Sequence, residues 1–474
     1  MTVGACVKDK HGRLPLHNAL TLKASPEIIG MIINGYPEAV CVKDDGNELP
    51  LHRALSNNSS LQVIQTLLMI YPDGTKTEDE DGQLPLHLAA ENNCSLEIIR
   101  ELIKAYPEGA SIKDHDDQLP VHLLLQNMAP VEVIREITSA YPDAVRVKGT
   151  DGRLPLHRAL SSNARPDVVE LLISAYPEGT MMKDDGFELP LHRALANKAS
   201  LETIVALLDA YPDGASVKDA DGQLPLHLAS ENNASVLVFA ALIKAYPEGA
   251  EVEDDDEQLP LHLACENCNL EVVKLLLEAY PDGASTVKSD GRLPLHVASE
   301  YLSTPAIFEE LIAAFPEGPS CKDSEGQLSL HIASASFASL EVIRTLIQAY
   351  PEGASTKNDI GQIPGLLASE NEAAPAVIIE LIAAYHEGMN MSSLNSDNGS
   401  IDSKVAIQRA MSTRASVGKI QALMKAYPEG VTVEEHFGEV SINIAITDEN
   451  ASEIEALLAD DNTLHSNDGC CSIS

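Results

Sequence analysis

The sequence predicts an all-α fold, a helix-turn-helix repeat solenoid that is elongated and curved. A motif of the form Leu-Pro-Leu-His recurs through most of the chain, and a Tyr-Pro dipeptide recurs in step with it. Successive motifs lie 35 residues apart, except for one gap of 34. A constant period of this length is typical of solenoids, in which each repeat buries its apolar face only against its neighbours.

The motif histidines define the register of the array. Ten of them fall at the same place in successive repeats: His17, His52, His87, His122, His157, His192, His227, His262, His296 and His331. An eleventh copy, Ile363-Pro364-Gly365-Leu366, keeps the proline and lacks the histidine. Two degenerate copies follow around 405–410 and 440–445. We therefore predict about thirteen repeats, eleven of them over residues 1–388 and two over residues 404–459.

Each repeat reads as a short helix, a loop, a longer helix and a turn. Pro85 suits the first position of a helix, because that position needs no backbone N–H and its φ is already helical. Ser95 is placed to cap a second helix over residues 96–105, whose apolar residues follow helical spacing. Pro107 and Gly109 are expected to end it.

The segment 82–89, Gly-Gln-Leu-Pro-Leu-His-Leu-Ala, resembles the core of the ankyrin repeat, Gly-x-Thr-Pro-Leu-His-x-Ala. The chain departs from that pattern in two ways. Most repeats are two residues longer than the usual 33, and leucine (Leu14, Leu49, Leu84 and their equivalents) replaces the threonine. Because the hydroxyl that would cap the first helix is absent, we expect weaker capping and stronger packing.

The composition limits the classes of partner and compartment. The chain has 32 basic and 72 acidic residues, a net charge of −40. This charge repels nucleic-acid phosphates and anionic lipid, and it favours basic partners. Eight scattered cysteines suggest no disulfide framework, which fits a reducing compartment. Without an apolar run of membrane-spanning length or a signal-peptide pattern, we expect a cytoplasmic protein, with the nucleus as the alternative.

Three segments stand apart from the simple repeat. Residues 4–9 match residues 214–219, so the chain begins inside a repeat; either the reading frame is truncated, which we favour, or that end meets a partner. The first four repeats recur as a 140-residue block, through recent duplication or as two equivalent docking sites. Residues 389–403 form a polar Ser/Asn-rich insert, and residues 460–474 form an acidic tail.

The candidate chemical groups favour structural roles. Equivalent histidines lie roughly 10 Å apart along a helix stack, too far for shared metal coordination, and the resemblance implies that they brace backbone between repeats. Cys265 and Cys268 form a lone Cys-x-x-Cys, for which interface packing is favoured over zinc or redox chemistry. The run 251–257 is expected to be a solvated acidic finger and not a calcium loop. We predict no catalytic residue, metal or cofactor.

The last four residues, 471–474, fit a C-a-a-X box, which would place a prenyl group on Cys471. One lipid chain anchors a protein only marginally, and the acidic upstream tail excludes a polybasic helper. Cys470 would then be a palmitoylation site. The alternative is that this short tail carries no signal.

The resemblance implies a non-catalytic scaffold or adaptor that binds other proteins along a concave surface of turn fingers and first helices. The alternative is a lipid-anchored adaptor at a membrane surface. The fingers place one polar residue before each Leu-Pro: Arg13, Glu48, Gln83, Gln118, Arg153, Glu188, Gln223, Gln258, Arg292 and Gln327. The ends of the first helices add Glu91, Asn92, Glu231 and Asn232. Plain solvation is the competing interpretation for most of these side chains.

Overall fold

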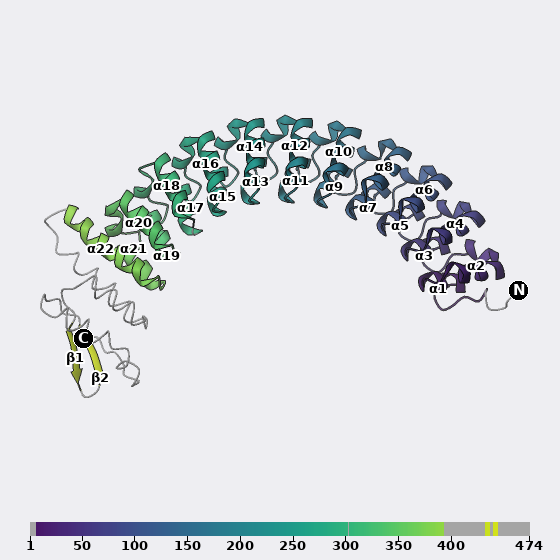
Figure 1. The fold of residues 1–474 in the computed structure, drawn as a ribbon, viewed down its shortest axis with the longest axis horizontal. Coiled ribbons are helices and arrows are strands. Elements are labelled where there is room, and N and C mark those ends of the chain that lie inside the picture. Colours follow the sequence, from purple (N-terminus) through teal and green to yellow (C-terminus); the bar gives the residue numbers. More distant parts are fainter. Residues whose placement is uncertain (1–5, 302, 393–431, 437–438, 444–474) are drawn as a thin grey trace. The chain divides into compact units, whose positions relative to one another are not determined.

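The computed structural model describes residues 6–301, 303–392, 432–436 and 439–443. Its helices alternate between short and long along the chain (Figure 1), and a 3₁₀ turn follows each long helix except the last. Two compact parts are present, Met1–Gly249 and Ala250–Ser474, and each is described by itself.

The N-terminal part contains seven repeats. The short first helices are α1 (Pro15–Thr21), α3 (Pro50–Ser56), α5 (Pro85–Glu91), α7 (Pro120–Gln126), α9 (Pro155–Ser161), α11 (Pro190–Ala196) and α13 (Pro225–Glu231). The second helices are α2 (Pro26–Gly35), α4 (Leu61–Ile70), α6 (Leu96–Ala105), α8 (Val131–Ala140), α10 (Pro166–Ala175), α12 (Leu201–Ala210) and α14 (Val236–Ala245). The 3₁₀ turns are η1 (Pro37–Cys41), η2 (Pro72–Lys76), η3 (Pro107–Ser111), η4 (Pro142–Arg146), η5 (Pro177–Met181), η6 (Pro212–Ser216) and η7 (Pro247–Glu251).

The C-terminal part repeats the same order. Its first helices are α15 (Pro260–Glu266), α17 (Pro294–Glu300), α19 (Ser329–Ala335) and α21 (Pro364–Glu370). Its second helices are α16 (Leu270–Ala279), α18 (Pro305–Ala314), α20 (Leu340–Ala349) and α22 (Pro375–Ser392), and its turns are η8 (Pro281–Ser285), η9 (Gly318–Ser320) and η10 (Pro351–Ser355). Strands β1 (Thr432–His436) and β2 (Glu439–Asn443) form an antiparallel pair.

Helix ends follow the residues expected to set them. Pro85 begins α5, and the helix ends in a Schellman motif in which Asn93 takes a left-handed φ of 49°. The Cys94 N–H then bonds the Ala89 carbonyl at 2.9 Å. Ser95 is the N-cap residue of α6 as predicted, but its hydroxyl makes no capping bond.

The helices pack in two rows within each part. First helices contact first helices of the neighbouring repeats, as α5 contacts α3 and α7, and second helices contact second helices. In the N-terminal part, the odd-numbered helices lie on the inner side of the row in Figure 1. Side chains such as Leu86 and Ile99 fill the space between the rows, 4% and 0% exposed. Burying each such side chain contributes about 1.5–3 kcal/mol. The predicted all-α repeat solenoid is confirmed in these helical residues.

Two local expectations differ from the structure. The polar insert was predicted from residue 389, yet α22 continues to Ser392, because His386 stands where other repeats have the proline that ends the second helix. The degenerate repeat expected around 440–445 begins with strand β2 instead, in which Val440 and Ile442 alternate with polar residues. Residues 393–403, the rest of 404–459 and the tail 460–474 lie outside the described residues.

Ser329 offers a test of how proline sets the helix start. It occupies the first position of α19, where the other first helices have proline, and it is fully buried. Its hydroxyl has no hydrogen-bond partner among the described residues. Changing Ser329 to Pro should raise the free energy of unfolding by about 0.4–1 kcal/mol, because proline restricts the unfolded chain and removes the unpaired hydroxyl. Urea denaturation measures this change. Pro294→Ser, the reverse change in α17, should destabilise; a stabilised Pro294→Ser variant would contradict the explanation.

Candidate functional site

Most of the motif histidines connect successive repeats through both ring nitrogens, whereas Nε2 of His157 and Nε2 of His262 have no hydrogen-bond partner among the described residues. In α5, the Leu84 N–H donates to His87 Nδ1 at 3.1 Å, so the ring caps the helix start. Nε2 lies 3.1 Å from the Ile112 carbonyl and 3.2 Å from the Gln118 carbonyl of the next repeat. Because Nδ1 accepts a hydrogen bond, the ring proton belongs on Nε2. The cap expected to be weak without threonine is therefore supplied by the histidine itself.

The same bridge recurs along both parts. All ten motif histidines are buried, with 0% exposure. Nε2 contacts a backbone carbonyl of the next repeat at His17, His52, His122, His192, His296 and His331, over distances of 2.9–3.3 Å. These contacts give the imidazole rings a structural role.

Burial keeps these rings neutral. Desolvation lowers the pKa of His52, His122, His157, His262 and His331 to about 4, although nearby carbonyl acceptors favour the charged form. A neutral ring is what the Leu N–H requires as its acceptor. The motif histidines are therefore set up as fixed hydrogen-bonding groups.

The cysteine pair lies inside the helical stack. Burial raises the pKa of the Cys265 thiol, which disfavours the reactive thiolate. Cys268 Sγ lies 3.1 Å from the Tyr301 carbonyl and 3.3 Å from Ser303 Oγ, both in the following repeat. No group of three or more histidine, cysteine or acidic residues suited to a metal occurs in the part of the chain that the structure describes.

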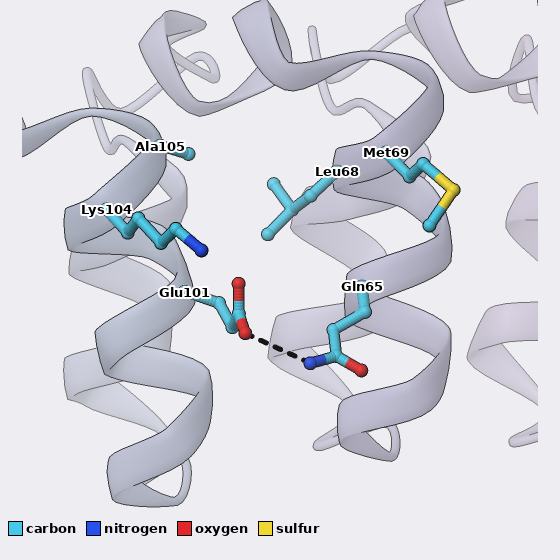
Figure 2. Close-up of a pocket in the computed structure, with 6 residues that line it drawn as sticks. All are labelled: Gln65, Leu68, Met69, Glu101, Lys104 and Ala105. Atoms are coloured by element: carbon cyan, nitrogen blue, oxygen red, sulfur yellow. Dashed lines mark hydrogen bonds between the residues drawn. The ribbon is translucent and has the colours of Figure 1, made fainter.

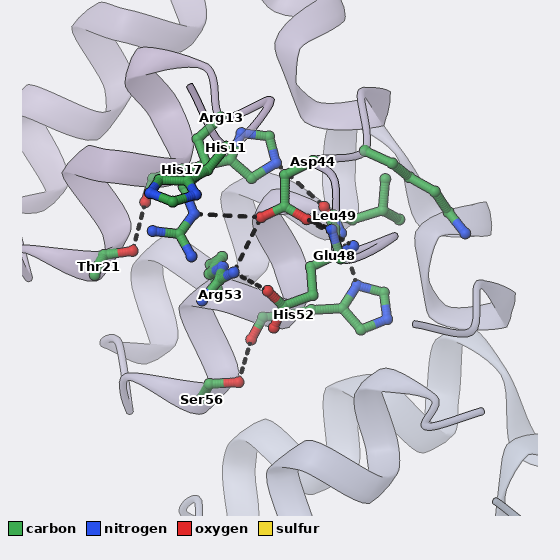
Figure 3. A network of polar contacts seen from close by, with 12 residues as sticks. His11, Arg13, His17, Thr21, Asp44, Glu48, Leu49, His52, Arg53 and Ser56 are labelled. Atoms are coloured by element: carbon green, nitrogen blue, oxygen red, sulfur yellow. Dashed lines mark hydrogen bonds and ion pairs between the residues drawn. The ribbon is translucent and has the colours of Figure 1, made fainter. Parts of the chain in front are cut away.

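The residues before Leu-Pro were expected to form an exposed contact surface, but the structure buries them in part. All ten are half-buried. Figure 3 shows Arg13 and Glu48 in a network centred on Asp44, whose side chain is 1% exposed. Asp44 Oδ1 accepts the N–H groups of Gly46 and Glu48 at 3.0 and 3.1 Å, and Oδ2 accepts Arg53 Nη2 at 3.0 Å. Arg13 Nε reaches Asp44 Oδ2 at 3.5 Å, and Arg53 also pairs with Glu48.

The Asp44 network holds one finger of the repeat to the next. Burial would raise the pKa of Asp44, but the Arg53 guanidinium and the Glu48 amide outweigh it, so this pKa lies below its ordinary value. Burial raises the pKa of Glu48 despite the attraction of Arg53. Most charged side chains of this network are thus paired with one another within the protein.

An equivalent network occurs 140 residues later. Asp184, with a side chain 1% exposed, pairs with Arg153 at 3.4 Å and Arg193 at 2.9 Å. Glu188 pairs with Arg193 as Glu48 pairs with Arg53. The duplicated block therefore keeps its internal contacts as well as its sequence.

In the C-terminal part, Arg292 has several acidic neighbours. It lies 2.8 Å from Glu300, 3.5 Å from Asp323 and 3.7 Å from Asp290. Gln327 donates to Glu325 at 2.6 Å. These two predicted contact residues also make bonds within the chain.

The ends of the first helices contain both structural and exposed groups. Asn92 Nδ2 donates to the Leu88 carbonyl at 2.9 Å, and Asn232 Nδ2 donates to the Leu228 carbonyl at 3.0 Å. These amides satisfy carbonyls at the helix C-terminus. Glu91 and Glu231 are exposed at the last positions of α5 and α13.

A row of lysines was not identified from the sequence. Each donates its Nζ to the backbone carbonyl 35 residues ahead, at 2.8–3.2 Å: Lys8, Lys43, Lys113, Lys148, Lys183 and Lys322. Aligning the repeats would have shown lysine recurring at this position. The contact itself needs the three-dimensional stack, because it joins residues from different repeats.

A shallow groove lies on the second-helix row, between α4 and α6 (Figure 2). Its volume is about 480 Å³, and Leu68, Met69 and Ala105 line it together with polar residues. Gln65 Nε2 donates to Glu101 Oε1 across it at 3.0 Å. None of the predicted contact residues lies there.

A comparison with models of protein families agrees with this architecture. A family model described as Ankyrin repeats (3 copies) matches residues 51–184 and 191–287. The chain is an ankyrin-repeat protein. Among solved structures, the ankyrin repeat domain of Bcl-3, described as a unique member of the IkappaB protein family, is 22% identical. The match covers 49% of this chain and 99% of that one, with a TM-score of 0.40.

A search among curated proteins finds no match. Ankyrin repeats are in general modules for protein–protein interaction. Among the described residues of this ankyrin-repeat protein, no helix has the length and apolar character needed to span a bilayer.

The neutral histidines predict how stability depends on pH. Their folded pKa values, about 4 for five of them, lie below the unfolded value of 6.5, so the unfolded chain binds more protons between these limits. Stability is therefore complete above pH 6.5 and is lost as the pH falls toward 4. At pH 5, each of these five histidines should lower the free energy of unfolding by about 2 kcal/mol. Urea denaturation from pH 7.5 to 5 measures the loss. The control is His115→Gln, a change at an exposed histidine outside the motif, and this variant should lose stability with falling pH as the wild type does. Constant stability of the wild type down to pH 5 would refute the assignment.

Proposed function

We propose that this ankyrin-repeat protein is a non-catalytic scaffold or adaptor that binds basic segments of partner proteins. The binding surface consists of the first helices and the fingers between repeats. The observation that carries this proposal is the way in which the chain uses its cations. Six lysines donate to the next repeat and several arginines pair with half-buried or buried acids, while the chain keeps a large acidic excess.

The lysine row is the clearest case. Lys43, Lys148 and Lys183 donate to backbone carbonyls, so their bonds neutralise no carboxylate. Arg53 and Arg193 are held by half-buried or buried acids. With 72 acidic against 32 basic residues in the chain, the remaining surface charge is strongly negative. A field of this sign accelerates the encounter with cationic segments and selects against anionic ones.

The stack supports this role mechanically. Neutral histidines tie many of the fingers to their neighbours, and buried Asp44 and Asp184 do the same in their own fingers, so surface groups are presented on a preorganised frame. Preorganisation lowers the ordering cost of binding. Half of the ten predicted finger contacts, Arg13, Glu48, Arg153, Glu188 and Arg292, contribute to this frame. Glu91 and Glu231 are the better candidates for direct contact, because both are exposed.

The proposal predicts that Glu91 and Glu231 attract basic peptides. Replacing both with Gln should weaken binding of a short fluorescent Lys/Arg peptide by roughly three- to fivefold at low salt, because each exposed charge pair contributes modestly. Fluorescence anisotropy across a salt series measures this, and wild-type binding should weaken steadily with salt. The matched control replaces Glu132 and Glu170, exposed on the second helices α8 and α10, with Gln. Equal weakening by both pairs would refute the first-helix surface.

We also propose, as a separate alternative, that a prenyl group on Cys471 tethers the protein to membranes, with Cys470 as a second acylation site. The support is the sequence pattern at 471–474. Changing Cys471 to Ser should move the protein from the membrane fraction to the supernatant of eukaryotic cells, and Cys470→Ser should have a smaller effect. Intact mass distinguishes the outcomes: a prenyl mass with loss of residues 472–474 supports the tether, and an unmodified Ser474 end opposes it.

A further inference from the structure

One finger of the N-terminal part holds an unusual residue in a left-handed conformation. The equivalent position is taken by Gly12, Asn47, Gly82, Asp117, Gly152, Phe187 and Gly222, with φ between 57° and 71°. Glycine adopts this conformation freely, and Asn and Asp tolerate it. A phenylalanine there is strained, with φ at 61°. The fold does not require a strained residue here, because the six other fingers of this part have glycine, asparagine or aspartate at this position.

This strained residue is also exposed. Phe187 is 64% exposed, and it shares its finger with Met181 and Met182, which are 49% and 37% exposed. Other repeats place serine at the position of Met181 (Ser111, Ser216). We call residues 181–188 the Phe187 finger. It therefore presents three large apolar side chains, and two of them, Phe187 and Met181, stand where the other repeats of this part have polar or small residues.

The duplicated block supplies an internal comparison. Asn47 lies 140 residues before Phe187, in a finger whose Asp44 network matches the Asp184 network. The charged framework is thus the same in both copies, and the apolar side chains are what distinguishes the second. The second copy presents a different surface, contrary to the hypothesis of two equivalent docking sites.

The surroundings of the Phe187 finger are acidic. Of the three acids in residues 181–188, Asp184 and Glu188 are paired with arginines, so Asp185 supplies the exposed charge. The one lysine, Lys183, is tied to the Lys218 carbonyl at 2.8 Å. Asp185 is exposed on the finger, and Asp221 is exposed on the next one. The Asp185 N–H bonds the Asp151 carbonyl at 3.4 Å, which attaches the finger to its neighbour. An apolar site on a fixed support within negative charge complements a segment that is both apolar and cationic.

We propose that Phe187, Met181 and Met182 anchor a partner segment that carries large apolar and basic side chains together. Aromatic residues are frequent binding anchors, and methionine adapts its shape to varied apolar surfaces. The inference rests on the proposed binding function and narrows its partner class to cationic amphipathic segments. Burial of the ring in the complex offsets the strain that the free protein retains.

The test uses the full chain and a fluorescent leucine–lysine peptide patterned as an amphipathic helix. Phe187→Asn restores the residue found at position 47, so it should raise the melting temperature while weakening peptide binding by about tenfold. Met181→Ser, which installs the residue of positions 111 and 216, should weaken binding by a few-fold. A lysine–serine peptide of equal charge should bind wild type weakly, with no response to Phe187→Asn.

Phe337→Asn is the matched control. Phe337 is also a left-handed phenylalanine, with φ of 63° and 63% exposure, but it lies in the loop between α19 and α20 and not in a finger. This change should stabilise the protein equally and leave peptide binding unaltered. Unchanged binding by Phe187→Asn, or equal loss with Phe337→Asn, overturns the anchor while the scaffold proposal stands. Failure of wild type to bind either peptide overturns both.

Discussion

The structure depends on a buried neutral imidazole that must make two bonds at once. One nitrogen accepts the N–H of the leucine that begins its own helix, and the other faces a carbonyl of the next repeat, as His87 faces Ile112. Local helix capping and the stacking of repeats are therefore coupled through one ring. Losing either bond would leave a buried polar group unpaired, which typically costs about 1–3 kcal/mol. This coupling explains why the motif recurs with its spacing intact.

Charged groups also connect neighbouring repeats. Asp44 and Asp184 organise their fingers by accepting backbone N–H groups and then arginines from two repeats. Lysines donate further hydrogen bonds to backbone carbonyls of the next repeat. Many cations are thus bonded within the frame, in a chain that has 72 acidic and only 32 basic residues. We propose that differences between repeats, such as Phe187 against Asn47, determine which partners bind.

Periodicity made the helical array predictable, because every repeat restates the same apolar spacing and the same proline. The second helix at 96–105 followed from that pattern, and the bridging role of the histidines was implied by the resemblance to the ankyrin repeat. The network of Arg13 and Asp44 was not predicted, because the two residues lie 31 positions apart and meet only in the stack. Arg13 was expected on an exposed contact surface and is half-buried. Strand β2 was missed because only Val440 and Ile442 reveal its alternation, and α22 continued because His386 replaced a proline.

The most direct measurement is the protonation state of the motif histidines in the folded protein, read from nitrogen-15 shifts of the imidazole rings. The account predicts that His52, His122 and His331 are neutral at pH 6 and carry their proton on Nε2, because Nδ1 accepts a backbone N–H and burial lowers their pKa to about 4. Rings that are protonated at pH 6, or that carry their proton on Nδ1, would contradict it.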